Sequence, residues 1–192
     1  MLDKSIPYAG LYMRREPGAP FLTAMIPSGF EFRCYNDGDE QSWARIEASV
    51  LEFASEFAAL MYFKDYFIPN RELLYNRCLF IEKQGGEKVA TATAWWSDIG
   101  GRRLPWLYWV GVRPEYQGIG LGKAIVARAT EMLTGFYKCE PIYLKTQTWS
   151  YKAVDIYRKC GYMPTNERAL YRSPGDNLKK ALRILRRMQA GK

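Results

Sequence analysis

The sequence predicts a mixed α/β domain, in which a central mixed β-sheet is flanked by helices, and three observations support this. Apolar runs of strand length alternate along the chain with longer runs of helical period. Two strands are joined by the turn Gln84-Gly85-Gly86-Glu87, which is typical of a hairpin. A further strand, Leu104 to Val112, passes through glycine-spaced residues directly into a helix. The predicted order is β-α-α-β-β-β-α-β-α, with a terminal strand or helix.

The first part of the chain divides into an arm, a strand and two helices. Residues 1–29 combine four prolines and three glycines with apolar side chains, so we expect an arm that lies over the domain, 30–192, or over a partner subunit. Residues 30–35 alternate as a strand, and a helix with an apolar stripe follows over 40–54. A second helical segment over 57–67 ends before a proline.

The second part holds the remaining strands and three helices. The hairpin strands cover 77–83 and 88–96, and the apolar strand over 104–112 ends before Pro114, which cannot donate to a ladder. Further elements are a helix over 121–137, a strand over 141–147, a helix over 151–160 that stops at Gly161, a weak strand over 162–171, and a basic amphipathic helix that begins at Ser173-Pro174.

Length and composition favour one domain with a sizeable core. The chain has 192 residues, of which 48% are hydrophobic, and no apolar run approaches the roughly 18 residues that cross a bilayer. The N-terminus, MLDKSIPYAG, has no export-signal pattern, so we expect a cytoplasmic protein with no membrane partner. The four cysteines are widely spaced, and reduced, mostly buried thiols are expected rather than disulfides or a metal site.

Histidine is absent, and this narrows the chemistry. The usual neutral-pH base, the Ser-His and Cys-His nucleophile pairs and most zinc sites are excluded. Net charge is +8, from 28 basic and 20 acidic residues. A nucleic-acid partner would fit this charge, but a polyphosphate ligand and ordinary surface lysines explain it equally well, and the glycine-spaced turn fits nucleic acid poorly.

The turn after the strand at 104–112 predicts an anion site. Gly118, Gly120 and Gly122 precede a helix start, where free amides and the positive end of the helix dipole converge. A P-loop is excluded, because Gln117 and Ala124 stand where it needs glycine and Ser or Thr. A dinucleotide fingerprint needs G-x-G-x-x-G, and the spacing here differs.

The remaining pattern, Gln117-x-x-Gly120-x-Gly122 directly after a Val-x-Pro strand end, resembles the acetyl-coenzyme A loop of GNAT-type N-acetyltransferases. The run Ala153-x-x-x-Tyr157-x-x-x-Gly161-Tyr162 is similar to the second signature of that family. Two motifs in the right order are far more specific than one, and the resemblance covers roughly residues 30 to 165. It implies a GNAT-like fold whose sheet splays between its fourth and fifth strands.

The resemblance also implies a co-substrate and a mechanism. Acetyl-coenzyme A would bind in the splay, a backbone amide near Val110 would polarise the thioester carbonyl, and an amine would attack directly. Tyr157 would be the general acid that protonates the departing thiolate. No metal is implied. The residues expected at the cofactor are Val110, Gly111, Val112, Gln117, Gly118, Ile119, Gly120, Leu121, Gly122, Lys123, Ser150 and Tyr157.

The sequence departs from the family pattern at two places. Ser150 stands where the family usually has Asn, so one hydrogen bond to the pantetheine arm replaces two. The strand at 104–112 lacks the carboxylate that many members carry, and the next strand has Lys145, which would suit an acceptor with a carboxylate or phosphate. Candidate bases by chain position are Glu52, Glu56 and Asp98, whereas Glu115 is expected at the phosphate end, and each of the four could instead be an ordinary surface charge.

Two functions from different classes therefore remain. The first is an N-acetyltransferase acting on a primary amine of a small molecule or a peptide. The second is a non-catalytic acyl-coenzyme A binder, which the missing carboxylates favour. Five tryptophans are expected to lie in the core or in the wall of the cleft; the alternative is that they line an aromatic acceptor pocket. A homodimer, built through the N-terminal arm, is left open.

Overall fold

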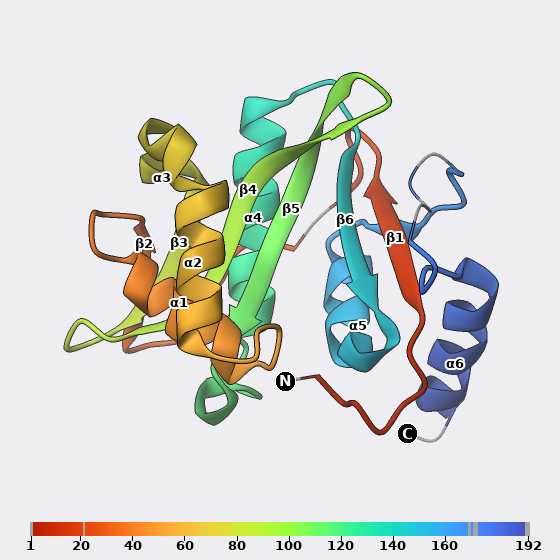
Figure 1. Ribbon diagram of the computed structural model, residues 1–192, viewed down its shortest axis with the longest axis horizontal. Coiled ribbons are helices and arrows are strands. Elements are labelled where there is room, and N and C mark those ends of the chain that lie inside the picture. Colours follow the sequence, from red (N-terminus) through yellow and green to blue (C-terminus); the bar gives the residue numbers. More distant parts are fainter. Residues whose placement is uncertain (1, 21, 169, 171–172, 191–192) are drawn as a thin grey trace.

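The computed structural model describes residues 2–20, 22–168, 170 and 173–190, and their fold is a twisted sheet with helices on both faces (Figure 1). The sheet has seven strands in the order β2-β3-β4-β5-β6-β1-β7. No helix among these residues is long and apolar enough to cross a bilayer. The elements are β1 (Gly10–Arg15), β2 (Phe30–Cys34), α1 (Glu40–Ser49), α2 (Glu56–Tyr66), α3 (Arg71–Arg77), β3 (Cys78–Lys83), β4 (Lys88–Ile99), β5 (Arg102–Val112), α4 (Leu121–Phe136), β6 (Ile142–Gln147), α5 (Tyr151–Lys159), β7 (Met163–Pro164) and α6 (Leu178–Ala190).

Strands β2 to β5 form the antiparallel half of the sheet. Alternate side chains along each strand pack into one of two apolar cores, one on each face. In β3, Leu79 and Ile81 pack into a core that includes α4, whereas Phe80 packs into a second core with α1 and α2. Side chains of successive strand residues point to opposite faces, so α1 and α2 cover one face and α4 covers the other. Figure 1 shows α1 and α2 in front of β3 and β4, with α4 behind.

The sheet splays between β5 and β6, which are the fourth and fifth strands predicted from the sequence. These strands run parallel, and the structure records one pair between them, Trp106 with Tyr143. Beyond that pair the strands diverge toward the end of β5 that leads into α4, as Figure 1 shows. The predicted fold class, a mixed sheet that opens at this position, is confirmed.

The N-terminal segment departs from the expectation of a surface arm. Its residues 10–15 form β1, which pairs antiparallel with both β6 and β7 inside the sheet. Leu11 and Met13 in this strand are fully buried. The chain then passes close to two glycines of the later motifs: the carbonyl of Pro20 lies against Gly161, and the ring of Pro27 lies near Gly120.

Several element boundaries also differ from those predicted. Helix α1 ends at Ser49 because Leu51 adopts a left-handed φ of 70°, which a helix cannot continue. The final helix begins at Leu178, where the Asn177 side chain accepts from the Lys180 amide as a cap, and not at Ser173. The short helix α3 was not predicted. Of the weak strand over 162–171, only β7 is paired, and residues 169 and 171 lie outside the described ones.

The cysteines are unpaired, but only two of them are buried. Cys78 and Cys160 lie in the cores, whereas Cys34 and Cys139 are exposed. The expectation of mostly buried thiols is therefore half right.

Candidate functional site

The glycine-spaced turn leads from the open end of β5 into α4. Gly118 and Gly120 have φ values of 86° and 101°, which lie in the left-handed region that a Cβ disfavours. Gly120 is the residue directly before the first helical turn. The amides of that turn, from Leu121 to Lys123, have no intrahelical acceptors and point out of the helix end. The turn thus presents amides and a helix dipole at one place.

The neighbours of this turn leave its outer side open. Ile119 is 52% exposed, and the side chain of Lys123 is also exposed. The side chain of Gln117 is exposed, but its Nε2 already donates a hydrogen bond to the carbonyl of Val112 at 2.7 Å. Leu121 is buried in the core, and a Cβ added at Gly122 would lie 3.2 Å from Cδ1 of Ile156. Gly122 therefore allows α4 and α5 to pack closely.

A β-bulge distorts β5 just before the turn. Thr91 pairs with Gly111 and Thr93 pairs with Tyr108, so Trp109 and Val110 together lie opposite one residue of β4. Trp109 has a φ of 47°, a left-handed conformation that is rare for a bulky side chain. The bulge changes the direction of the backbone groups at Val110 beside the splay. The role of an amide near Val110 stays a prediction.

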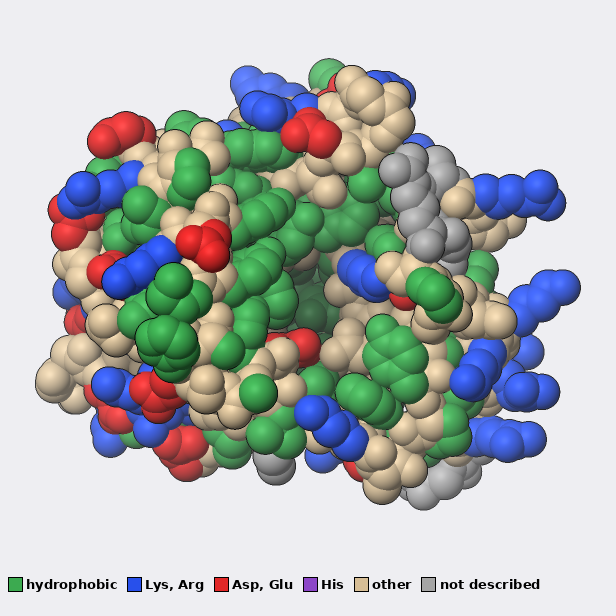
Figure 2. All heavy atoms as spheres, viewed as in Figure 1, with side chains coloured by type: hydrophobic (Ala, Val, Ile, Leu, Met, Phe, Trp, Pro, Cys, Tyr) green, Lys and Arg blue, Asp and Glu red, His purple; other side chains and the backbone are tan. Residues whose placement is uncertain are grey.

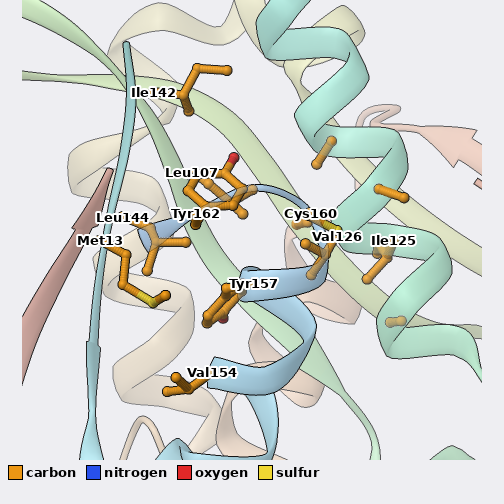
Figure 3. Close-up of a cluster of buried hydrophobic side chains, with 14 of the residues drawn as sticks. Met13, Leu107, Ile125, Val126, Ile142, Leu144, Val154, Tyr157, Cys160 and Tyr162 are labelled. Carbon is orange, nitrogen blue, oxygen red and sulfur yellow. The ribbon is translucent and has the colours of Figure 1, made fainter. Parts of the chain in front are cut away.

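Tyr157 lies at the splay from the side of α5. The residue is 7% exposed, and in Figure 3 its ring leaves α5 on the side that faces Leu144 of β6. Burial, followed by the negative charges of Glu52 and Glu47, raises the pKa of the Tyr157 phenol above its ordinary value. The phenol is therefore fully protonated at neutral pH, as a general acid must be. Ser150, at the start of α5, is partly buried.

Glu47 is a buried carboxylic acid on the opposite side of the splay. It is fully buried in α1, and among the described residues no donor reaches either of its carboxylate oxygens. A Cβ added at Gly111 would lie 2.9 Å from Oε1, so the carboxyl group lies against the backbone that follows the bulge. Desolvation, followed by the charge of Glu52, raises the pKa of Glu47 well above its usual range.

Glu52 places a second carboxylate at the mouth of the same site. Its side chain reaches solvent, and its Oε1 accepts a hydrogen bond from Nε2 of Gln147 in β6 at 3.2 Å. Partial desolvation raises the pKa of Glu52, whereas the bond from Gln147 and the charge of Lys4 lower it. Because β6 is the far wall of the splay, this bond joins the two halves of the sheet across the opening.

The first residues of the chain also bridge the two walls. The amide of Leu2 donates to the carbonyl of Val50 at 3.4 Å, at the end of α1. The amide of Asp3 donates to the carbonyl of Trp149 at 3.0 Å, just before α5. Figure 1 shows this end of the chain below the gap between β5 and β6.

The other candidate bases lie outside the splay. Glu56 faces Arg45, and Asp98 pairs with Arg103 at 3.4 Å, both on the surface. Glu115 is held by Arg113 near the glycine-spaced turn. Lys145 is on β6, where its Nζ lies 3.0 Å from Oδ2 of Asp176.

Glu47 was not predicted from the sequence, although its position in the helical pattern of α1 marks it. Glu47 follows Trp43 by four residues and precedes Val50 by three, so it occupies the apolar stripe of α1. A carboxylate on the core face of a helix is uncommon and marks a special environment. The two carboxylates near the splay also weaken the case for a non-catalytic binder, which rested on missing acids.

Comparison with known proteins identifies relatives of this chain. A family model described as the Acetyltransferase (GNAT) family matches residues 41–162. A mycothiol acetyltransferase of Streptomyces bingchenggensis is 28% identical over 168 residues, which cover 84% of this chain and 53% of the relative. A mycothiol acetyltransferase of Cellulomonas flavigena is 26% identical over 166 residues, with 82% and 46% covered. The chain therefore spans about half the length of these curated relatives.

Solved structures share the fold at low sequence identity. A GCN5-related N-acetyltransferase from Sphaerobacter thermophilus superposes with a TM-score of 0.64 and 20% identity, over 83% of this chain and 49% of that one. A GNAT-family acetyltransferase from Colwellia psychrerythraea gives 0.63 and 11%, over 85% and 55%. At these identities the likeness concerns the fold alone.

Proposed function

The chain belongs to the acetyltransferase (GNAT) family, and from this premise we propose that it transfers an acetyl group from acetyl-coenzyme A to a primary amine. One observation carries the proposal: the bulge in β5, the glycine-spaced turn and Tyr157 meet at one opening in the sheet. The amine belongs to a small molecule or a peptide. Two curated relatives are named mycothiol acetyltransferases, which agrees with acetyl transfer.

The residues at the opening fit the cofactor. A diphosphate would be held by the amides from Gly118 to Lys123, because the left-handed glycines leave no Cβ in front of them. The pantetheine arm would lie along Val110 to Val112, whose edge lacks a recorded partner strand within the described chain beyond the pair at Trp106. Ser150 would offer one further hydrogen bond. When bound, acetyl-coenzyme A supplies an activated acetyl thioester.

The chain's own groups then transfer protons. An acceptor that enters as an ammonium ion loses one proton to become nucleophilic and a second as the nitrogen–carbon bond forms and the carbon–sulfur bond breaks, while the sulfur gains one proton and the other is released to solvent. The carboxylate of Glu52, at the mouth, accepts protons from the amine and passes them to solvent, whereas Glu47 behind it keeps its own proton. Tyr157 donates a proton to the sulfur, and its phenol is restored from solvent. The amide near Val110 stabilises the negative charge that develops on the carbonyl oxygen.

Binding and turnover test this proposal separately. Acetyl-coenzyme A should bind in calorimetry, and coenzyme A should be released when a panel of amines is added. Gly120→Ala should weaken binding tenfold or more, because its φ of 101° strains any other residue. Gly135→Ala, within α4 and with open space at its Cβ position, is the matched control and should bind normally. Binding without turnover on any amine would instead support a non-catalytic binder.

Proton removal by Glu52 has its own test. Glu52→Gln should lower kcat about 100-fold for an alkylamine that is protonated at neutral pH, whereas Glu47→Gln, which replaces a protonated carboxyl group by a neutral amide of similar shape, should lower it much less. For a weakly basic amine such as trifluoroethylamine, which is already neutral, the loss in Glu52→Gln should be much smaller. Equal losses for both amines would show that Glu52 serves the structure and not proton removal.

A further inference from the structure

A connected surface of aromatic rings lies beside the proposed acetyl site, on the sheet face that α1 and α2 cover. Its rings come from the segment between α1 and α2, from α2 and from β5, and adjacent centroids are 5.0 to 6.0 Å apart. We call this surface the aromatic floor. Its members are Phe53, Tyr62, Tyr66, Tyr108, Trp109 and Trp106.

The bulge in β5 brings two of these rings to the same face. Successive strand residues normally point to opposite faces, but the left-handed Trp109 lets Tyr108 and Trp109 both join the layer under α2. The floor thus begins next to Val110, where the reacting carbonyl would be held. Its position makes it the surface on which the body of an acceptor would lie.

The aromatic floor is only partly covered by the protein. Trp106 at its edge is buried, but Phe53, Tyr62, Tyr108 and Trp109 are partly buried, and Tyr66 is 37% exposed. Figure 2 shows the same face hollowed at its centre, with hydrophobic side chains along the wall formed by α2 and β5. A connected apolar surface that remains open in a folded protein is typical of a binding site.

The charges around the hollow favour a cation over an anion. The carboxylate of Glu52 lies at the mouth, whereas Glu47 behind it, on the side of α1, retains its proton and adds no charge. On the opposite wall, the Nζ of Lys145 lies 3.0 Å from Asp176, whose side chain is fully buried. Asp176 therefore offsets the positive charge that would otherwise attract an acceptor bearing a carboxylate or phosphate.

We propose that the acceptor is an arylalkylamine-like molecule, in which a primary ammonium group is joined by a short linker to a flat aromatic body. The aromatic body stacks on the floor at Tyr66, Tyr108 and Trp109, and the ammonium group enters between Glu52 and the bulge. The inference rests on the proposed acetyl transfer and adds the chemical class of the acceptor. Ring stacking and burial of apolar area supply the selectivity.

A panel of amines tests the class of acceptor. With the full chain and saturating acetyl-coenzyme A, kcat/KM for tryptamine and 2-phenylethylamine should exceed that for ethanolamine and glucosamine by about 10- to 100-fold. A second readout does not need turnover. In calorimetry with coenzyme A present, 2-phenylethylamine should bind at concentrations where ethanolamine gives no heat.

Two variants of α2 locate the effect. Tyr66→Ala should lower the ratio of kcat/KM for tryptamine over ethanolamine about tenfold, mainly through KM for tryptamine, and Tyr66→Phe should restore it. Phe57→Ala is the matched control, because Phe57 is in the same helix, is 72% exposed and lies outside the aromatic floor. The control should keep the wild-type ratio.

The outcomes separate this inference from the proposed function. If glucosamine or ethanolamine is acetylated as well as the aromatic amines, the transferase stands and the aromatic acceptor is overturned. An unchanged ratio in Tyr66→Ala would overturn it as well. If acetyl-coenzyme A binds but no amine is acetylated, both the proposed function and this inference fail.

Discussion

Glu47 carries an ionisable group inside an apolar layer, with consequences for the pH dependence of folding. Desolvation raises the pKa of Glu47 in the folded protein, whereas an unfolded glutamate has a pKa of about 4.3. Above that pH the unfolded state releases a proton that the folded state retains. The contribution of Glu47 to stability is therefore present at low pH and is lost as pH rises toward the folded pKa, at about 1.4 kcal/mol per pH unit.

We predict that Glu47→Gln removes this loss. The free energy of unfolding of the variant, minus that of the wild type, should increase with pH between about pH 5 and 7. Urea unfolding at several pH values measures the difference. Glu56→Gln changes a surface carboxylate of α2 and is the control. A difference for Glu47→Gln that stays flat over this range would contradict the buried, proton-retaining carboxyl group.

The Lys145–Asp176 pair gives a second prediction at the scale of single residues. The Asp176 side chain is fully buried, and its Oδ2 accepts from both Lys145 and the hydroxyl of Tyr12. Removing Lys145 leaves a buried carboxylate with too few donors. Lys145→Ala should therefore lower the free energy of unfolding by about 1 to 3 kcal/mol. Lys179→Ala, at an exposed lysine of α6, should change it by less than about 0.5 kcal/mol.

The result for Lys145 also bears on acceptor charge. The sequence alone predicts that Lys145 selects an anionic acceptor, because it does not show the pairing with Asp176. If Lys145→Ala folds with full stability and changes the preference between charged and neutral amines, Lys145 is free to act on the acceptor, and its ion pair with Asp176 is unimportant.

Among single residues, the motif positions and Glu52 were expected from the sequence, and Glu47 was not. Gly120 and Tyr157 follow from local spacing, because the chemistry of a helix start and of one helix turn depends on near neighbours. Glu47 is far from Tyr157 in the sequence, and the packing of α1 over the bulge places its carboxyl group against Gly111. Local spacing holds no information about that contact.

At the scale of elements, the main difference from the prediction is β1, a strand in a segment that was expected to be an irregular arm. Its residues pair with β6 along six positions from Gly10–Gln147 to Arg15–Ile142, so the N-terminus completes the wall opposite β5. Pro and Gly on both sides hid this strand, since they are typical of irregular segments. The partner of β1 is more than 120 residues away, and a sequence pattern does not reveal such a pairing.

The other elements were predicted well where their signal is local. The helix after the glycine-spaced turn was expected over 121–137 and occupies Leu121–Phe136, and the hairpin strands fall within a few residues of their predicted bounds. Helix α6 begins later than expected, because Ser173-Pro174 offered a plausible start but Asn177 provides the cap.

Substitutions in a strand inside the sheet should lower the free energy of unfolding more than substitutions in a surface arm. Leu11 is fully buried in the main core, so Leu11→Ala should lower the free energy of unfolding by about 2 to 5 kcal/mol. Met25 lies in the same N-terminal segment but is 79% exposed, and Met25→Ala should cost less than about 0.5 kcal/mol. Urea unfolding compares the two. Similar small costs for both would mean that the segment does not contribute a core strand.

At the scale of the whole molecule, the opening between β5 and β6 divides the sheet into two halves with unequal support. The antiparallel half is paired throughout from β2 to β5 and is covered by helices on both faces. The second half joins it through the pair at Trp106 and Tyr143, the hydrogen bond from Gln147 to Glu52, the bridging N-terminal residues and the core that α4 shares with β6 and α5. A ligand in the opening would add contacts to both halves at once.

This division predicts where a bound cofactor should slow hydrogen exchange. Without ligand, amides of Val110 to Val112 that face the opening should exchange quickly, because the structure records no strand partner on that edge among the described residues. Acetyl-coenzyme A at about 100 times its Kd stabilises the bound state by about 2.7 kcal/mol, which allows up to 100-fold slower exchange there and in the first turn of α4. Amides shared by β3 and β4 are already paired and serve as the internal control. Exchange followed by mass spectrometry distinguishes the outcomes: slowing at β5, β6 and the start of α4 supports a cofactor between the halves, whereas slowing confined to α6 would place the ligand elsewhere.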